Sequence, residues 1–172
     1  MIVVMGIDPG VASTGFGVVR AAGGKMSAVD GGVIEAPPGE AAAQRLARIH
    51  QEVEQLLGWH EPAALALEDV YFGKNVRSAI GVGQARGVVM LAATRRGIAC
   101  FDYTPQAVKM AVCGTGAAAK KQVQRMVETL LGLPQPPESD HAADALAVAI
   151  CHAAHAQAAR HLAGQLSGVG SA

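Results

Sequence analysis

The sequence predicts an α/β fold in which a mixed five-stranded sheet has helices on both faces. Three observations support this prediction. Apolar runs separated by glycine turns near the N-terminus are typical of hairpin-linked strands. Later apolar runs alternate with segments of helical periodicity, and the last third of the chain has helical patterns throughout. A length of 172 residues suits a single domain with a buried core.

Three strands are expected before residue 36. The run Met1–Ile7 predicts a buried first strand, and Pro9-Gly10 turns the chain into a second strand over Gly15–Arg20. After the turn at Gly23-Gly24, Met26–Glu35 fits a third antiparallel strand. These three segments therefore form one meander of the sheet.

The rest of the chain alternates and then becomes helical. Leu46, Ile49, Val53 and Leu56 recur at helical spacing, and this helix should end near Gly58. Thr104-Pro105 is an N-cap followed by proline at the first helical position. The remaining predicted elements are strands at 64–67 and 98–103 and helices at 76–95, 105–113, 117–131 and 140–156.

The formal net charge of zero conceals a strong polarity. Residues 74–125 contain nine basic side chains and a single acidic one, Asp102, so this segment has a net charge of +8 and the remainder −8. Two interpretations stay open. The segment could form a cationic surface for a polyanion, beside an acidic centre, or its charges could lie on solvated helix faces.

Several function classes are disfavoured. The three cysteines have no CxxC spacing, so they predict neither a disulfide framework nor a zinc site, but thiols in a reducing cytosol. No run approaches the roughly 18 uninterrupted apolar residues of a membrane span. The N-terminus lacks a basic flank and meets Asp8 too early for a signal peptide. We therefore expect a cytoplasmic protein with no membrane partner.

Acidic residues follow two predicted buried strands. Asp8 and Glu68 lie at the carboxyl ends of the first and fourth strands, the sheet edge where ligands bind in open α/β folds. His141 and Asp144 are three residues apart in the first turn of the last helix, so both can face one point. Each acid alone could instead serve a turn or a helix dipole.

Together these side chains favour a metal site. Clustered carboxylates raise one another's pKa unless divalent cations neutralise them. Mg²⁺ and Mn²⁺ prefer carboxylate oxygens, and a neutral histidine is an acceptable ligand for Mn²⁺. Two such ions about 4 Å apart can activate a water and position a scissile phosphate. The pattern therefore predicts metal-dependent phosphodiester hydrolysis.

Other elements admit more than one interpretation. Gly83 and Gly87 lie within a predicted helix, where they suit a dimer seam, a DNA contact or tight packing, with Arg86 on an opposite, polar face. Tyr71 and Phe72 could stack on unpaired bases or be buried beneath the sheet edge. The lysines flanking Gly114–Gly116 could hold phosphates or be solvated; they are Lys109, Lys120 and Lys121.

The assembled motifs resemble those of the RuvC family of Holliday-junction resolvases, in the RNase H-like superfamily. The resemblance extends from Ile2 to about His152. The matching segments are Gly6–Gly10 with Thr14-Gly15, Glu68 followed by Lys74-Asn75, Gly83–Gly87, Gly114–Gln124 and Ala142–Ala147. Their order and spacing are highly specific, whereas the first motif alone is weak.

The resemblance implies a homodimer that nicks four-way DNA junctions symmetrically, leaving 5′-phosphate and 3′-hydroxyl ends, in recombination and repair. It implies RuvA and RuvB as partners and two Mg²⁺ or Mn²⁺ ions per site. The family's metal-binding positions fall on Asp8, Glu68, His141 and Asp144, with Lys120 as a further catalytic residue. The DNA-binding candidates are Tyr71, Lys74, Arg77, Lys109, Lys120 and Lys121. Residues 1–156 should form the nuclease domain and 157–172 a flexible tail.

Three alternatives remain at this stage. The segment Asp8–Gly10 with Thr14-Gly15 also resembles the phosphate loop of sugar kinases and actin-like ATPases, although those folds need two such domains. A silent DNA-binding module could use the +8 segment, but it would gain little from acids facing phosphate. A related nuclease acting on RNA or single strands is the third alternative, because nothing in the motifs themselves recognises a 2′-hydroxyl.

Overall fold

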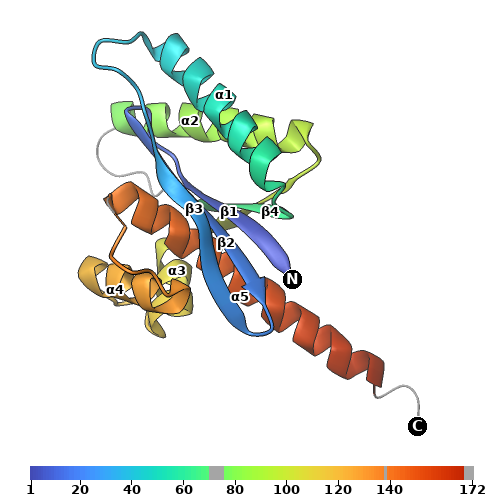
Figure 1. Ribbon diagram of the computed structural model, residues 1–172. Helices are drawn as coiled ribbons and strands as arrows, with labels where there is room; N and C mark the ends of the chain where they lie inside the picture. Colours follow the sequence, from blue (N-terminus) through green and yellow to red (C-terminus); the bar gives the residue numbers. More distant parts are fainter. Residues whose placement is uncertain (70–75, 138, 169–172) are drawn as a thin grey trace.

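The computed structural model describes residues 1–69, 76–137 and 139–168, with side chains at all of these positions except 76–78 and 164–168 (Figure 1). The strands are β1 (Ile2–Asp8), β2 (Ser13–Ala22), β3 (Lys25–Glu35), β4 (Ala64–Glu68) and β5 (Ala99–Tyr103). The helices are α1 (Ala42–His60), α2 (Val76–Arg95), α3 (Pro105–Cys113), α4 (Lys120–Leu131) and α5 (Asp140–Gly168).

The five strands form one mixed sheet in the order β3-β2-β1-β4-β5. β1, β2 and β3 pair in antiparallel fashion, and β4 and β5 extend the sheet in parallel with β1. The register pairs Ile7 with Leu67, so β1 and β4 end side by side. The predicted mixed five-stranded sheet is therefore confirmed.

The sheet separates two hydrophobic cores because successive strand residues point to opposite faces. On β1, Val4 packs with residues of α3, α4 and α5. Its neighbour Met5, together with Ile7, packs with α1 and α2 instead. Figure 1 shows α1 and α2 on one side of the sheet and α3, α4 and α5 on the other, which confirms helices on both faces.

α5 lies against β1 and β2 at very short range. A Cβ atom on Gly6 would overlap the carbonyl oxygen of Ala145, and one on Gly15 would overlap that of His141. Only glycine lets the backbone of a helix approach a strand this closely. The glycines of the N-terminal motifs thus determine where the first turns of α5 lie.

The structure corrects the expected end of the last helix. α5 was expected to end near Ala156 and to be followed by a flexible tail over 157–172, but it continues as a helix to Gly168. Residues 157–168 include alanine, glutamine, leucine and arginine, which are strong helix formers, and these outweigh the glycines and the serine in the same segment. Residues 169–172 lie outside the described part.

Smaller differences concern element starts. α4 begins at Lys120 and not at Ala117, and its N-cap Ala119 makes no side-chain cap hydrogen bond. The predicted start of α3 is confirmed, because Oγ1 of Thr104 accepts a hydrogen bond of 3.1 Å from the Ala107 amide.

Within the described residues, no helix has both the length and the apolar character needed to cross a membrane.

Candidate active site

Two carboxylates lie at neighbouring strand ends. Asp8 ends β1 and Glu68 ends β4, and the pairing of Ile7 with Leu67 places the two ends side by side. The Asp8 side chain is 22% exposed, and Glu68 is half-buried. A hydrogen-bonded turn follows Asp8: buried Thr14 donates from its hydroxyl to the Gly10 carbonyl over 2.7 Å and accepts from the Gly10 amide.

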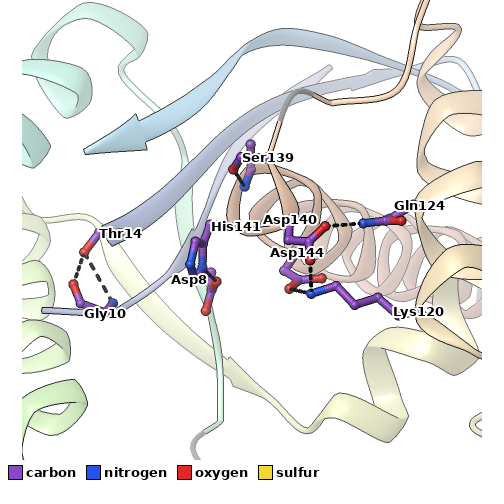
Figure 2. A network of polar contacts seen from close by, with 10 residues as sticks. Asp8, Gly10, Thr14, Lys120, Gln124, Ser139, Asp140, His141 and Asp144 are labelled. Atoms are coloured by element: carbon purple, nitrogen blue, oxygen red, sulfur yellow. Dashed lines mark hydrogen bonds and ion pairs between the residues drawn. The ribbon is translucent and has the colours of Figure 1, made fainter. Parts of the chain in front are cut away.

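The first turn of α5 brings an imidazole to Asp8. Nδ1 of His141 lies 2.7 Å from Oδ2 of Asp8, within hydrogen-bonding distance (Figure 2). Ser139 immediately precedes this helix, and its hydroxyl oxygen accepts a 3.1 Å hydrogen bond from the Ala142 amide. The backbone contact at Gly15 places His141 directly over β2, beside the end of β1.

α4 contributes the cation that faces α5. Nζ of Lys120 lies 2.9 Å from Oδ2 of Asp140 and 3.4 Å from Oδ2 of Asp144. Gln124, one turn further along α4, donates from Nε2 to Oδ1 of Asp140 over 2.7 Å. Figure 2 shows Asp140 and Asp144 turned toward α4, whereas His141 points toward Asp8.

The electrostatics reflect crowded carboxylates. Burial, and after it the negative charges of Asp144 and Asp8, together raise the pKa of Glu68 to about 7, against the opposing effect of Lys109 and Lys120. Burial likewise raises the pKa of Asp144, although Lys120 opposes this shift. The hydrogen bond with Asp140 raises the pKa of the Lys120 ammonium, so it remains charged.

A cavity of about 280 Å³ opens between β4, α3, α4 and α5. Its polar lining combines Glu68 and Asp144 with Lys109 and Lys120, and its apolar lining is Pro105, Val108, Val123 and Ala147. Two acids and two bases thus share one small space at the sheet edge. Such a space suits an anion that binds through a cation or through the lysines.

Arg86 of α2 supports the end of β4 from the opposite side. Its Nη1 donates to the carbonyl oxygen of Glu68 over 3.1 Å, and its Nη2 forms an ion pair with Asp102 of β5. The Arg86 side chain is only 16% exposed. The expectation that Arg86 lies on a polar face is therefore wrong: the guanidinium is used within the fold.

The donor set at this edge fits a divalent cation, although the carboxylates have other partners in this structure. Among the described residues, no three acidic, histidine or cysteine side chains meet as a ready-made ion site. His141 contacts Asp8, and Lys120 contacts Asp144. The raised pKa of Glu68 shows that its charge is poorly compensated, which is the situation that a divalent ion relieves. An ion bound here would replace the contact of Asp8 with His141 and that of Asp144 with Lys120.

The structure places most of the predicted site residues at this edge. Asp8, Glu68, His141 and Asp144 lie there with Lys109 and Lys120, whereas Lys121 is exposed on α4 and is not among the residues lining the cavity. Tyr71 and Lys74 lie outside the described residues, as does the side chain of Arg77.

Sequence reasoning missed the partners that hold the site together. Asp140 and Gln124 were not expected to take part, and Arg86 was misplaced. A signal was available for the first two: Lys120 and Gln124 are four residues apart, as are Asp140 and Asp144, so each pair lies on one helix face with complementary chemistry. Which helix faces meet is decided by packing, and no spacing within one helix reveals it.

The sheet order, with acids from β1, β4 and the last helix at one edge, defines the class of the molecule as an RNase H-like nuclease. A sequence model of the family described as crossover junction endodeoxyribonuclease RuvC matches residues 4–152. RuvC of Pelotomaculum thermopropionicum is 50% identical over 152 residues, covering 88% of this chain and 93% of the relative. RuvC of Rubrobacter xylanophilus is 50% identical over 151 residues, covering 88% and 84%.

A solved structure of a RuvC protein supports the same family assignment. T. thermophilus RuvC in complex with a Holliday junction substrate superimposes with a TM-score of 0.89 at 41% identity, covering 92% of this chain and 97% of the other. The chain belongs to the RuvC family of crossover junction endodeoxyribonucleases. Membership of this family implies that it is a divalent-metal-dependent nuclease.

Proposed function

We propose that the protein resolves four-way DNA junctions by nicking two strands symmetrically, leaving 5′-phosphate and 3′-hydroxyl ends. The observation that supports this most directly is that Asp8 and Glu68 end neighbouring strands at one sheet edge, where Glu68 and Asp144 share a cavity with Lys109 and Lys120. The homologue from T. thermophilus is described in complex with a Holliday junction substrate. The activity belongs to DNA recombination and repair, in the cytoplasm.

The side chains of the site have separable roles. Asp8, Glu68, His141 and Asp144 would hold two Mg²⁺ or Mn²⁺ ions, which supply Lewis acidity toward the scissile phosphate and its attacking water. Lys120, exposed at the cavity mouth, donates from Nζ to a phosphate oxygen on which negative charge develops. Lys109 lines the cavity wall and attracts the phosphate.

The test is cleavage of a labelled synthetic four-way junction in EDTA, Mg²⁺ and Mn²⁺, with duplex and single-stranded DNA as controls. We expect paired, religatable nicks in the junction only, and only with metal. Asp8→Asn and Glu68→Gln should abolish cleavage while junction binding in EDTA is preserved, because both changes remove ligand charge without removing basic contacts. Normal cleavage by either variant would overturn the assignment.

A homodimer supplies the two sites that symmetric nicking needs. Along α2, Ile80 and Leu91 are 57% and 52% exposed. Gly83 and Gly87 lie between them on the same helix face, and a Cβ on either glycine would meet no described residue within 4 Å. Tight packing within the chain therefore does not explain these glycines. We place the seam with a second copy of the chain on this face.

If this face of α2 forms the dimer interface, a charge placed on it should make the protein monomeric. Leu91→Arg puts a charge at the centre of an apolar contact, so the protein should sediment as a monomer and lose paired nicking. Met110→Arg is the control: Met110 is a 55% exposed apolar residue on α3, on the other side of the sheet, so this variant should remain dimeric. Sedimentation velocity measures both. A dimeric Leu91→Arg protein would move the seam elsewhere.

DNA contacts by Tyr71, Lys74, Arg77 and Lys121 also remain proposals, as do RuvA and RuvB as partners. Lys121 is exposed on α4 beside Lys120, so a DNA backbone that reaches the cavity could meet it. Lys74→Glu or Lys121→Glu should weaken junction binding. Each should also make the junction affinity depend less steeply on salt concentration, because each phosphate contact releases counterions.

A further inference from the structure

The outer edge of β3 is a second candidate binding surface. β3 is the last strand of the sheet, and within the described residues it pairs with β2 only. Its segment from Ala28 to Glu35 borders a cavity of about 630 Å³ on the α5 side of the sheet. An unpaired strand edge presents backbone amide and carbonyl groups that can pair with another extended chain.

A second cavity lies on the opposite face of the same strand. It has a volume of about 300 Å³ and is formed between β3 and α1. Asp30, Val33 and Glu35 line both cavities, so the strand edge runs between them. Because successive side chains of a strand point to opposite faces, a strand added here would direct alternate side chains into the two cavities.

The excess of acidic side chains around β3 and α1 indicates which kind of partner could bind there. Residues 25–61, which comprise β3 and α1, contain six acidic side chains and three basic ones. Asp30 and Glu35 line both cavities, and Glu52 lines the second. The basic side chain among these linings, Arg48, is held by Glu40 at 2.8 Å. The surface therefore complements a basic segment and repels nucleic acid.

Trp59 gives this surface an exposed aromatic anchor. It is the one tryptophan of the chain, lines the second cavity and is 73% exposed. Val29, on the strand edge itself, is 38% exposed. Tryptophan is enriched among the residues that dominate binding energy at protein interfaces, and its ring attracts lysine and arginine.

We propose that β3 binds an extended, lysine- or arginine-bearing segment of a partner protein by strand addition. The partner's backbone pairs with the free edge of β3. Its alternate side chains enter the two cavities, where the basic ones meet Glu35 and Glu52 beside Trp59. Asp30 is already in contact with Nε2 of His60, at 2.8 Å, and adds only to the local negative charge. This surface is separate from the carboxylates and lysines of the cleavage site.

The experiment uses the full chain and the native fluorescence of Trp59. A short synthetic peptide of alternating lysine and valine is titrated into the protein, beside a counterpart of alternating glutamate and valine. We expect the lysine peptide to shift the Trp59 emission to shorter wavelengths and to saturate, because binding buries the ring. The glutamate peptide should leave the emission unchanged. Equal responses to both peptides would overturn the proposal.

Backbone pairing and charge are tested separately. N-methylation of every second amide removes the donors of one peptide edge, so one of the two methylated series should lose binding and the other retain it. If both series bind like the parent peptide, strand addition is wrong. Glu35→Lys should weaken binding by about tenfold or more, whereas Glu61→Lys, a position outside both cavity linings, should not.

A folding control accompanies the charge variants. Far-ultraviolet circular dichroism and the thermal unfolding midpoint show whether Glu35→Lys keeps the sheet intact. Glu52→Lys provides the same charge reversal from α1, without touching the strand, and should also weaken the lysine peptide. If Glu52→Lys and Glu35→Lys fold and bind the peptide as the unchanged protein does, the acidic surface is not the recognition element and the proposal fails.

Discussion

Arg86 connects the end of β4 to β5 through a single guanidinium. One of its nitrogens donates to the Glu68 carbonyl and another pairs with Asp102, so the main chain that presents the Glu68 carboxylate is held from behind. A planar fork with several donors makes both contacts at once, which a lysine ammonium cannot do with the same geometry. We therefore regard Arg86 as a positioning residue for Glu68.

This role predicts a particular kinetic defect. Arg86→Met should lower kcat for junction cleavage by about tenfold or more, because small displacements of a reacting group are costly. The free energy of unfolding should fall by about 1–3 kcal/mol, the cost of leaving a partly buried polar group unpaired. Junction affinity in EDTA should hardly change. Single-turnover cleavage, gel-shift binding and urea unfolding measure the three quantities.

The matched control for this variant is Arg95→Met. Arg95 is exposed at the end of the same helix, so its loss removes equal charge without touching β4. Arg86→Lys distinguishes charge from geometry: it should restore part of the stability but little of the cleavage rate. A cleavage rate of Arg86→Met equal to that of Arg95→Met would show that Glu68 needs no support from α2.

At the scale of elements, the approach of α5 to the sheet determines whether His141 can reach Asp8. Gly15 of β2 pairs with Asp8 of β1, and the His141 backbone lies directly over Gly15. Gly15→Ala should push the first turn of α5 away from the sheet. We expect cleavage to fall by about a hundredfold, and overpacking to cost about 1–3 kcal/mol of unfolding free energy.

Gly31→Ala on β3 is the control for this change. A Cβ there would come no nearer than 3.6 Å to any described atom, which is an ordinary contact. It should therefore leave junction cleavage near the level of the unchanged protein. If Gly15→Ala cleaves as fast as Gly31→Ala, the helix accommodates the methyl group without moving the site, and the close approach has no catalytic role.

The elements were predictable to the extent that each is specified by its own residues. Periodicity and turn glycines located the five strands and the helix over Val76–Arg95 at nearly their observed bounds. The pairing of Lys120 with Asp140 and Asp144 depends on how α4 packs against α5 and was not predictable from either helix alone. Gly15 was noted as part of a motif, but its contact with His141 appears only once the helix is in place.

For the whole molecule, the separation of basic and acidic residues seen in the sequence is only partly reproduced on the surface of the fold. The basic segment supplies Lys109 and Lys120 to the cleavage cavity, but Arg86 is turned inward and does not add to a DNA-facing surface. Most of the acidic residues outside this segment lie either at the cleavage site or in the β3–α1 region. The net charge of each segment thus indicated the kind of partner. Which charged residues share a surface could be seen only in the folded structure.

The stability of the whole molecule should depend on pH through His152 of α5. Its side chain is buried, with the Phe101 ring at 4.5 Å between centroids and the Tyr103 hydroxyl 2.8 Å from Nδ1. Burial lowers the pKa of His152, and the charge of His155 lowers it further. The unfolded chain therefore binds a proton at this histidine at a higher pH than the folded protein does.

It follows that the contribution of His152 is complete above its unfolded pKa of about 6.5 and is lost as the pH falls toward its lower folded value. The loss cannot exceed about 1.4 kcal/mol per pH unit for one proton. Urea unfolding of the unchanged protein and of His152→Gln between neutral and mildly acidic pH isolates this term, because the other titrating groups are common to both. Glu68, whose raised pKa gives the opposite slope, cancels in the difference. Parallel curves for the two proteins would show that His152 titrates alike in the folded and unfolded states, and the burial argument would then fail.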